Sequence, residues 1–224
     1  MKNIFIAGLL VFCGQLSVAQ NTTKWDSTYR PGNYAQKLAQ FRSYPNANTD
    51  VIFLGNSIID YTDWNELLQL PQARNRGISG DISFGVLQRL DEVTEGKPAK
   101  VFILIGINDI SRNIPDSIIL DNYKKIIQRI KSESPKTKIY FNTLFPVNNT
   151  FPDKNHFNKD EHILYINSEL KKLGTTEKIT VIDIHPQFLD NENRLDKKYT
   201  YDGLHPNSEG YTKWASILMP YIKE

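Results

Sequence analysis

Four short segments, far apart in the chain, carry the types of side chain that acyl transfer by a serine requires. They are Gly55-Asn56-Ser57, Gly77-Ile78-Ser79-Gly80-Asp81, Gly106-Ile107-Asn108-Asp109 and Asp202-Gly203-Leu204-His205. A serine hydroxyl attacks a carbonyl carbon effectively only when a base takes its proton and a third group orients that base. The oxyanion that forms also needs hydrogen-bond donors that are already in place. The four segments contain a candidate for each of these roles.

Ser57 is the expected nucleophile, because it follows the apolar run 50–54 through a turn of small residues, at the end of a predicted strand. His205 is the expected base. Asp202 lies on the same loop as His205, and Gly203 lets that loop turn sharply, so the carboxylate can reach Nδ1 of the imidazole. Nε2 is then free to face Ser57. We therefore predict a catalytic triad of Ser57, His205 and Asp202.

The donors of the expected oxyanion hole are the backbone N–H groups of Ser57 and Gly80 and the side-chain amide of Asn108. Gly80 can bring its N–H close to a substrate because it has no side chain. Four further residues are candidates for substrate contact, namely Asn56, Tyr61, Trp64 and Asp81. Tyr61 and Trp64 either form a wall of the acyl pocket or pack against the first helix after Ser57.

Apolar runs alternate with helical patterns along the chain, which is typical of a parallel sheet covered on both faces. Strands are expected at Val51–Leu54, Ala73–Arg76, Val101–Ile105, Ile139–Leu144 and Ile179–Ile184, and helices at Tyr34–Tyr44, Asp63–Leu70, Phe84–Val93, Ser117–Ser132, Glu161–Leu173 and Ser208–Tyr221. The helix after the fourth strand is expected to stop at Gly174, a suitable residue for a helix end.

The alternation predicts the α/β class, as a three-layer α/β/α sandwich around a doubly wound, five-stranded parallel sheet. The strand order 2-1-3-4-5 is our expectation. Three of the four segments directly follow strands, and the fourth lies in the loop before the last helix. They should therefore meet beyond the carboxyl ends of the strands, where such sheets bind ligands.

The four segments resemble the sequence blocks of the SGNH/GDSL hydrolase superfamily, in the same order. The resemblance runs from about Asp50 to the C-terminus, and the spacing is similar to that of the branch containing the platelet-activating-factor acetylhydrolase catalytic subunits. It implies a flavodoxin-like SGNH hydrolase fold and a GDSL lipase or acylhydrolase activity. Asn56 stands where the family usually has an aspartate. This exchange removes a negative charge beside Ser57 and could alter the pH optimum.

Residues 1–20 have the features of a secretory signal peptide, and residues 21–224 are predicted to form a single SGNH hydrolase domain. Lys2 gives a positive start, and the apolar stretch Ile4–Cys13 is too short to span a bilayer. Ser17-Val18-Ala19 resembles a signal-peptidase site. We expect cleavage after Ala19 or the next residue and a secreted or periplasmic protein.

Two alternatives exist for this N-terminal segment. It could instead form a buried first helix, or Cys13 could carry a lipid anchor. Phe12 argues against the anchor, because lipoprotein signals share a small residue directly before the cysteine that carries the lipid.

Composition excludes several classes of site and partner. Cys13 is the one cysteine among 224 residues, so the cleaved chain would have no cysteine nucleophile, iron–sulfur cluster or cysteine zinc site. The chain has 27 basic and 25 acidic side chains, and loss of Lys2 leaves 26 against 25, a net charge of +1. This balance gives no reason to expect nucleic acid or an anionic membrane surface as a partner. No other segment is long and apolar enough to span a membrane, and oligomeric state is left open.

Asp153 and His156 repeat the spacing of Asp202 and His205, but they lie in the polar stretch 148–160. We interpret that stretch as a flexible surface segment that flanks the cleft. A metal site is a further alternative that no spacing requires. It would use Asp183, His185 and Asp202.

These features predict a secreted serine esterase that cleaves small acyl esters through an acyl-enzyme, with no cofactor or metal. Acetyl esters of carbohydrates, or of small molecules, are the expected substrates. One alternative is a lipid acylhydrolase of the lysophospholipase or thioesterase type. Another is a catalytically weak glycan-binding domain. This alternative remains because Asn56 replaces the aspartate usual in the family. A flavodoxin-like cofactor binder is disfavoured, because the loop after the first strand lacks a phosphate cradle rich in Gly, Ser and Thr.

Overall fold

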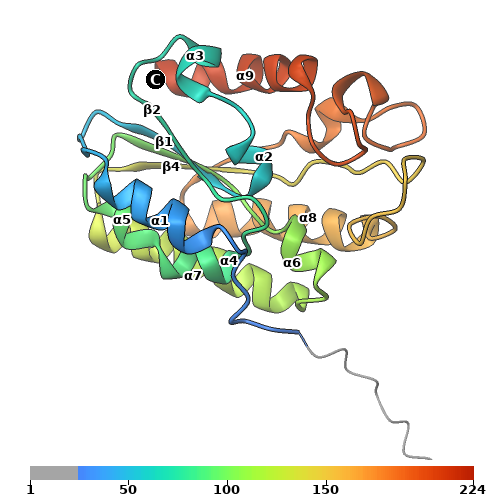
Figure 1. Ribbon diagram of the computed structural model, residues 1–224, viewed down its shortest axis with the longest axis horizontal. Helices are drawn as coiled ribbons and strands as arrows, with labels where there is room; N and C mark the ends of the chain where they lie inside the picture. Colours follow the sequence, from blue (N-terminus) through green and yellow to red (C-terminus); the bar gives the residue numbers. More distant parts are fainter. Residues whose placement is uncertain (1–24) are drawn as a thin grey trace, which may run out of the picture.

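A parallel sheet runs through the middle of the protein, whose computed structural model describes residues 25–224 (Figure 1). The expected signal segment at 1–20 lies outside the described residues. The strands are β1 (Val51–Gly55), β2 (Ala73–Gly77), β3 (Lys100–Leu104), β4 (Lys138–Asn142) and β5 (Thr180–Ile182). Their order is β2-β1-β3-β4-β5 and every neighbouring pair is parallel, which confirms the predicted topology.

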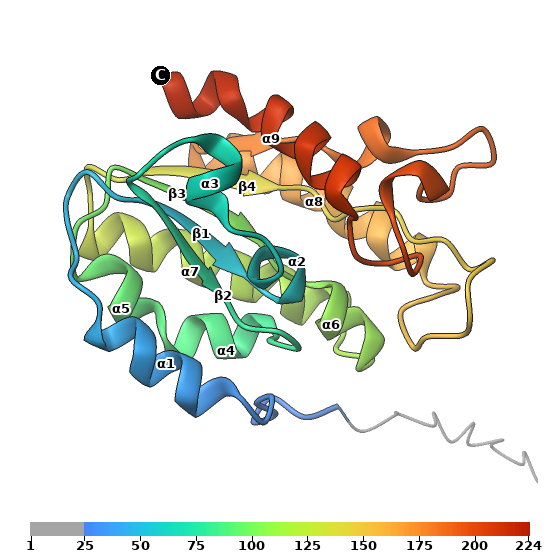
Figure 2. The ribbon, with the colours of Figure 1, turned by 45° about the horizontal axis from the view of Figure 1, so that its top comes forward.

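Helices cover both faces of this sheet and give the three layers of the sandwich (Figures 1 and 2). One face carries α1 (Tyr34–Ser43), α4 (Ser83–Gln88), α5 (Leu90–Thr94), α7 (Asp116–Glu133) and α8 (Asp160–Glu177), and the other carries α3 (Trp64–Leu68) and α9 (Ser208–Lys223). The central strands β1 and β3 are buried along their whole length, as a sheet covered on both sides requires. Within residues 25–224, no helix combines the length and the apolar character needed to cross a membrane.

Stacked aromatic rings fill the space between the sheet and the α3–α9 layer. The rings of Phe53 and Trp64 are nearly parallel with centroids 4.1 Å apart, and Trp214 meets Trp64 edge-on at 5.0 Å. Trp64 is 0% exposed, and its indole N–H donates to the carbonyl of Ile59. The candidate substrate contact at Trp64 is therefore corrected, because this ring is part of the core. Trp214 is buried as its helical pattern predicts.

Four short helical turns follow strands or lie in loops, and the sequence pattern does not reveal them. They are α2 (Ser57–Asp60), α6 (Ile107–Ser111) and the two 3₁₀ turns His185–Phe188 and Lys197–Tyr199. Two of the four expected segments, those holding Ser57 and Asn108, thus begin helices directly after β1 and β3. Backbone N–H groups at such helix starts point toward the carboxyl edge of the sheet.

Two helices differ from the sequence prediction. The segment expected as one helix over 84–93 is divided at Arg89, whose side chain turns inward to a buried carboxylate. The helix expected to stop at Gly174 continues to Glu177. A Cβ at Gly174 would lie 2.4 Å from a methyl carbon of Val181. This glycine therefore permits close packing of α8 on β5 and does not end the helix.

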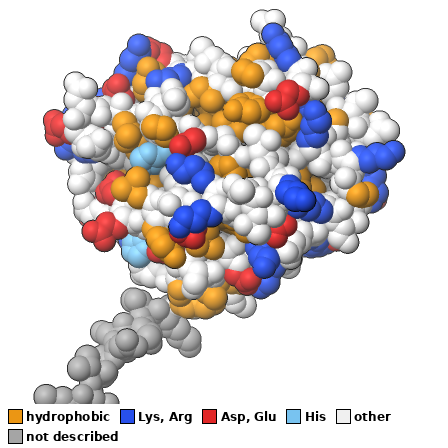
Figure 3. Space-filling view, turned by 180° about the vertical axis from the view of Figure 1, so that it is seen from behind, with side chains coloured by type: hydrophobic (Ala, Val, Ile, Leu, Met, Phe, Trp, Pro, Cys, Tyr) orange, Lys and Arg blue, Asp and Glu red, His pale blue; other side chains and the backbone are white. Residues whose placement is uncertain are grey.

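Basic and acidic side chains of the described residues are interspersed over the face opposite to the view of Figure 1, with apolar side chains between them (Figure 3). Fields from exposed charges are largely screened beyond about 10 Å at 0.1 M salt, and interspersed charges of opposite sign also offset one another. This face therefore carries no extended field of one sign.

Candidate active site

Ser57, His205 and Asp202 form a continuous chain of hydrogen bonds at the carboxyl edge of the sheet. Ser57 Oγ lies 3.0 Å from Nε2 of His205, and Nδ1 of His205 lies 2.8 Å from Oδ2 of Asp202. Ser57 is 6% exposed, and the other two side chains are partly buried. The fold thus brings together the three residues that the sequence singled out, although 148 positions separate the serine from the histidine.

The loop that holds Asp202 and His205 is built around the carboxylate. Oδ1 of Asp202 accepts hydrogen bonds from the backbone N–H groups of Leu204, at 3.0 Å, and His205, at 2.8 Å. Gly203 has a φ of +81°, which glycine adopts without strain. Burial opposes ionisation, but the hydrogen bonds from the backbone and the ring of His205 outweigh it, so the pKa of Asp202 is lowered. An ionised Asp202 is the form that orients the His205 ring.

Asn56 shapes the turn that presents Ser57. Its Oδ1 accepts from the backbone N–H of Ile58 at 3.0 Å, so Asn56 is the N-cap of α2. The side chain is 0% exposed. The candidate substrate contact at Asn56 is therefore corrected, because a buried capping amide does not reach a ligand. A neutral amide performs this cap as a carboxylate would.

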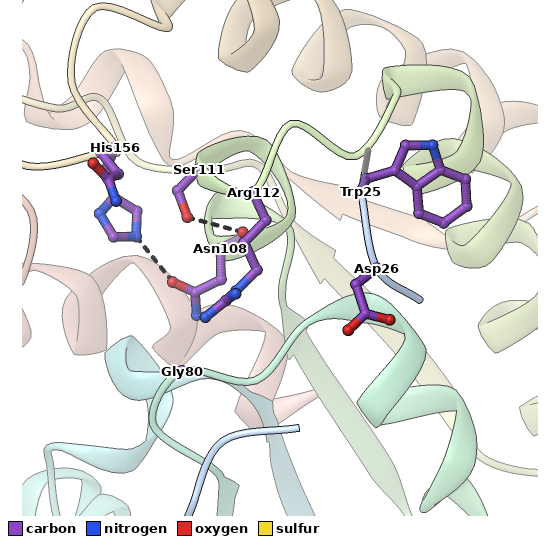
Figure 4. A pocket seen from close by; sticks show the side chains of 8 residues that line it. Trp25, Asp26, Gly80, Asn108, Ser111, Arg112 and His156 are labelled. Carbon is purple, nitrogen blue, oxygen red and sulfur yellow. Dashed lines mark hydrogen bonds between the residues drawn. The ribbon is translucent and has the colours of Figure 1, made fainter. Parts of the chain in front are cut away.

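Gly80 and Asn108, the two expected oxyanion donors besides Ser57, lie close to one another. Gly80 has a φ of +81°, and Asn108 lies in the first turn of α6. Nδ2 of Asn108 donates to the backbone carbonyl of Asp81 at 2.9 Å, while its Oδ1 lies 3.0 Å from Nε2 of His156. Gly80, Asn108 and His156 line a cavity of about 470 Å³ that Figure 4 shows from close by. Arg112 contributes to its wall.

A buried ionic cluster lies beneath the loop of Gly80 and Asp81. Arg89 donates to the Asp81 carboxylate at 3.1 Å, to the carbonyl of Gly55 at 3.1 Å and to the carbonyl of Arg76 at 2.9 Å. Glu92 receives hydrogen bonds from both Arg76, at 2.9 Å, and Arg89, at 3.3 Å. One guanidinium thus joins the ends of β1 and β2 to the loop of Gly80 and Asp81. The candidate substrate contact at Asp81 is corrected, because its carboxylate is 0% exposed and paired within this cluster.

Two half-exposed tyrosine rings lie close to the His205 ring. The ring centroid of Tyr61 is 5.1 Å from that of His205, and the ring of Tyr201 is nearly parallel to the imidazole at 6.1 Å. Tyr61 is 51% exposed and Tyr201 57%. Tyr61 also places its hydroxyl 3.0 Å from Oγ of Ser79, in the loop of Gly80 and Asp81. Of the four substrate-contact candidates, only Tyr61 presents its side chain at the open part of the site.

Asp109 follows Asn108 and is fully enclosed. Its carboxyl accepts hydrogen bonds from the backbone and hydroxyl of Ser83, but burial raises the pKa of Asp109 to about 7. The folded protein then retains a proton that the unfolded chain releases near pH 4. Stability contributed by this group is complete at low pH and is lost as the pH rises toward 7.

We therefore predict that raising the pH from 5 to 8 lowers the stability of the unsubstituted protein more than that of Asp109→Asn, since the variant lacks this titration. Urea unfolding midpoints measured at both pH values check the change, because a constant structural cost of the substitution cancels in their difference. A difference that does not vary with pH would show that Asp109 does not titrate in the folded state.

No three His, Cys, Asp or Glu side chains within residues 25–224 are grouped as a metal ion would require. Asp183, one member of the alternative metal site, instead accepts from Lys171 at 2.8 Å and from the hydroxyl of Thr143 at 3.1 Å. Within the described part of the chain, the Asp183 carboxylate therefore forms an ion pair and a hydrogen bond.

Three residues at the site were missed in the sequence prediction, namely Arg89, His156 and Tyr201. The signal for His156 was its position in the loop directly after β4, whose carboxyl end lies at the same edge as Ser57. The segment around it was expected to be a flexible surface segment that flanks the cleft, with no role for His156. It packs instead against the loop of Asp202, where the backbone N–H of Asn148 donates to the carbonyl of Gly203 at 2.8 Å.

Comparison with known proteins shows the family of this chain. Residues 53–213 match the sequence model of the GDSL-like lipase/acylhydrolase family. Platelet-activating factor acetylhydrolase IB subunit alpha2 of Homo sapiens is 28% identical over 184 residues, which are 78% of this chain and 76% of that protein. An N-acylneuraminate cytidylyltransferase of Escherichia coli is 29% identical over 194 residues, 85% of this chain, but the match spans only 44% of that longer protein.

Two solved structures share both fold and sequence similarity. A Streptococcus pneumonia protein assigned as a platelet activating factor superposes with a TM-score of 0.78 at 28% identity, covering 85% of this chain and 92% of that one. A Bacteroides fragilis protein assigned as an acylhydrolase gives 0.75 at 26% identity, with coverage of 87% and 98%. The family match covers well over half of the residues, so the chain belongs to the GDSL-like lipase/acylhydrolase family.

Proposed function

We propose that the protein is an exported serine esterase that removes small acyl groups, acetyl above all, from esters on carbohydrates. The observation that carries the proposal is the hydrogen-bonded chain from Ser57 Oγ through His205 to Asp202, with separations of 3.0 and 2.8 Å. Export rests on the signal-like segment at residues 1–20. The acetyl group is supported by the acetylhydrolases among its relatives.

In the first half of the reaction, Ser57 Oγ attacks the ester carbonyl carbon while Nε2 of His205 takes the hydroxyl proton. The ionised Asp202 stabilises the imidazolium that results. The oxyanion receives hydrogen bonds from the backbone N–H groups of Ser57 and Gly80 and from Nδ2 of Asn108. Nδ2 has a second hydrogen beyond the one that it gives to the Asp81 carbonyl.

In the second half, the imidazolium of His205 gives its proton to the oxygen of the leaving alcohol as the C–O bond breaks, which leaves an acyl group on Ser57. Water then enters, His205 takes one of its protons, and the resulting hydroxide attacks the acyl carbon. The acid leaves and the proton returns to Ser57 Oγ. Ser57 supplies the nucleophile for the first attack, water supplies it for the second, and His205 carries the proton in both.

Tyr61 and Tyr201 support a carbohydrate as the alcohol part of the substrate. The leaving oxygen must lie within hydrogen-bond distance of Nε2 of His205 to receive its proton. The rest of the alcohol then lies near the two exposed rings, whose centroids are 5.1 and 6.1 Å from that of His205. Tyrosine combines an apolar face with a polar hydroxyl, which suits a sugar ring with apolar C–H faces and polar edges.

A panel of esters tests this proposal. We expect release of acetate from acetylated xylose and glucose derivatives, and slow release of long acyl chains from lysophosphatidylcholine. Preferential long-chain release would instead identify a lipid acylhydrolase. Absence of hydrolysis across the panel, combined with retained binding of acetylated glycans, would identify a glycan-binding domain.

We further predict that Tyr61→Ala and Tyr201→Ala each raise KM for an acetylated disaccharide about threefold to tenfold, since a stacked ring contributes about 1 kcal/mol. Hydrolysis of ethyl acetate should change little, because its alcohol is too small to reach either ring. Tyr165→Ala is the matched control, because Tyr165 is equally exposed, at 51%, but lies on α8. Equal effects on both esters would contradict a role in holding the alcohol.

A further inference from the structure

Asn108 can stabilise an oxyanion only if its amide is turned the right way. An amide rotated by 180° would present the carbonyl oxygen in place of the N–H group, and an oxygen lone pair repels an oxyanion. The side chain therefore needs neighbours that distinguish its oxygen from its nitrogen. The backbone carbonyl of Asp81 is one such neighbour, because it can only accept and therefore selects Nδ2, at 2.9 Å.

His156 is the second neighbour. Its Nε2 lies 3.0 Å from Oδ1 of Asn108, and Figure 4 shows the ring and the amide pointing toward one another. Oδ1 can only accept, so Nε2 must carry the proton of the ring. The Asp81 carbonyl and the His156 N–H thus select opposite ends of the same amide, and both select the orientation that leaves an Nδ2 hydrogen for the oxyanion.

The surroundings of His156 keep the ring neutral. Nδ1 is buried without a hydrogen-bond partner among the described residues, so a second proton there would be unpaired. Burial, with a contribution from His205, lowers the pKa of His156 to about 4. A neutral ring avoids repulsion of the imidazolium that forms on His205 during turnover.

His156 differs from His205 in a way that separates their roles. Both follow an Asp-x-x-His spacing, but Asp153 is exposed and makes no hydrogen bond to Nδ1 of His156. Without an orienting carboxylate, His156 lacks the partner that makes His205 a base. Among residues 25–224, the hydrogen-bond partner of the His156 ring is Asn108.

One loop links the two ends of the site. Residues 143–159 between β4 and α8 carry His156 to Asn108 and also carry Lys154 to within 3.5 Å of Oδ2 of Asp202. A Cβ at Gly203 would lie 2.5 Å from the carbonyl oxygen of Asn148 and 2.9 Å from the ring of Phe151. This packing holds the loop, and with it the His156 ring, at a set distance from the Asp202 loop.

We propose that His156 is a positioning residue that sets the orientation of the Asn108 amide and so completes the oxyanion hole. This inference rests on the proposed esterase activity. The hydrogen bond also draws electron density toward Oδ1, which makes the Nδ2 hydrogens better donors when charge develops on the substrate.

The test compares His156→Phe, which removes the donor but keeps a ring, with His156→Gln, whose amide nitrogen can take the place of Nε2. We expect His156→Phe to lower kcat for p-nitrophenyl acetate about tenfold or more with little change in KM, since loss of a whole oxyanion donor costs about 10²–10³. His156→Gln should recover most of that loss. Asp153→Asn, on the same loop, is the control that should leave kcat unchanged.

A double-substitution cycle separates positioning from a general structural role. In an Asn108→Ala background, His156→Phe should cause almost no further loss, because the group that it orients is gone. Full kcat in His156→Phe, equal losses in the Phe and Gln variants, or independent losses in the cycle would each overturn the proposal. Failure of the esterase activity itself would show differently, as an unsubstituted protein that hydrolyses none of these esters.

Discussion

Ser57→Ala is expected to reduce the turnover of acetyl esters by about 10⁴–10⁶-fold, because the variant has no nucleophile to form an acyl-enzyme. The residual rate reflects substrate binding and the oxyanion donors alone. Steady-state kinetics with p-nitrophenyl acetate measure the loss, and KM should change little because the removed hydroxyl does not hold the substrate.

The fold should tolerate this substitution. The Ser57 hydroxyl bonds only to His205 among the described side chains, and the cap from Asn56 to Ile58 remains in the variant. An unchanged melting temperature would confirm that the loss is chemical. Ser216→Ala, at an exposed serine of α9, is the control that should retain full activity. Undiminished turnover by Ser57→Ala would refute the mechanism.

Arg89→Met is expected to destabilise the protein by about 3–5 kcal/mol, because it leaves the Asp81 and Glu92 carboxylates buried with one guanidinium fewer. It also removes the donor that joins the carbonyls of Gly55 and Arg76 to the loop of Gly80 and Asp81. Activity per folded molecule should therefore fall as well, since both the turn of Ser57 and the loop of Gly80 lose this support.

Urea unfolding measures the first effect and kcat under conditions of full folding measures the second. The double variant Arg89→Met/Asp81→Asn should regain part of the stability, because the unpaired charge is gone. Arg42→Met is a matched control, since Arg42 pairs with Asp91 at 2.8 Å on the surface and both side chains are half exposed. That change should cost less than about 1 kcal/mol. Equal destabilisation by the two substitutions would contradict the role given to the cluster.

The topology could be predicted because its determinants are local. The strands β1, β3 and β4 contain apolar runs that can be recognised in the sequence, and right-handed crossovers then restrict the sheet to few orders. The polar strand β2, with the sequence Ala-Arg-Asn-Arg-Gly, is recognised mainly by its place between two helical segments. The interruption at Arg89 and the continuation through Gly174 could not be predicted in this way. Both depend on partners distant in sequence, the Asp81 carboxylate in one case and the Val181 side chain in the other.

The same distinction separates the site residues that could be predicted from those that could not. Ser57 and Asn108 were identifiable because a parallel sheet brings the carboxyl ends of its strands to one edge, independently of the conformation of the loops. His156 lies on a long loop whose path depends on side-chain packing, such as that of Gly203 against Asn148. Tyr201 directly precedes Asp202, but the sequence does not show that its ring lies beside that of His205. The opposite error is a predicted substrate contact at a side chain that is buried, and it occurred at Asn56, Trp64 and Asp81. Each lies close to Ser57 or Gly80 in sequence, but its side chain points into the core.

Covalent labelling by a fluorophosphonate tests the central claim most directly, because the reagent reacts with a serine only where a base and an oxyanion hole activate it. Intact-protein mass spectrometry followed by peptide mapping locates the adduct. We predict one adduct per chain, on Ser57, with complete loss of esterase activity and greatly slowed labelling in His205→Ala. An active protein that is not labelled at Ser57, or that keeps its activity once Ser57 is labelled, would contradict the account.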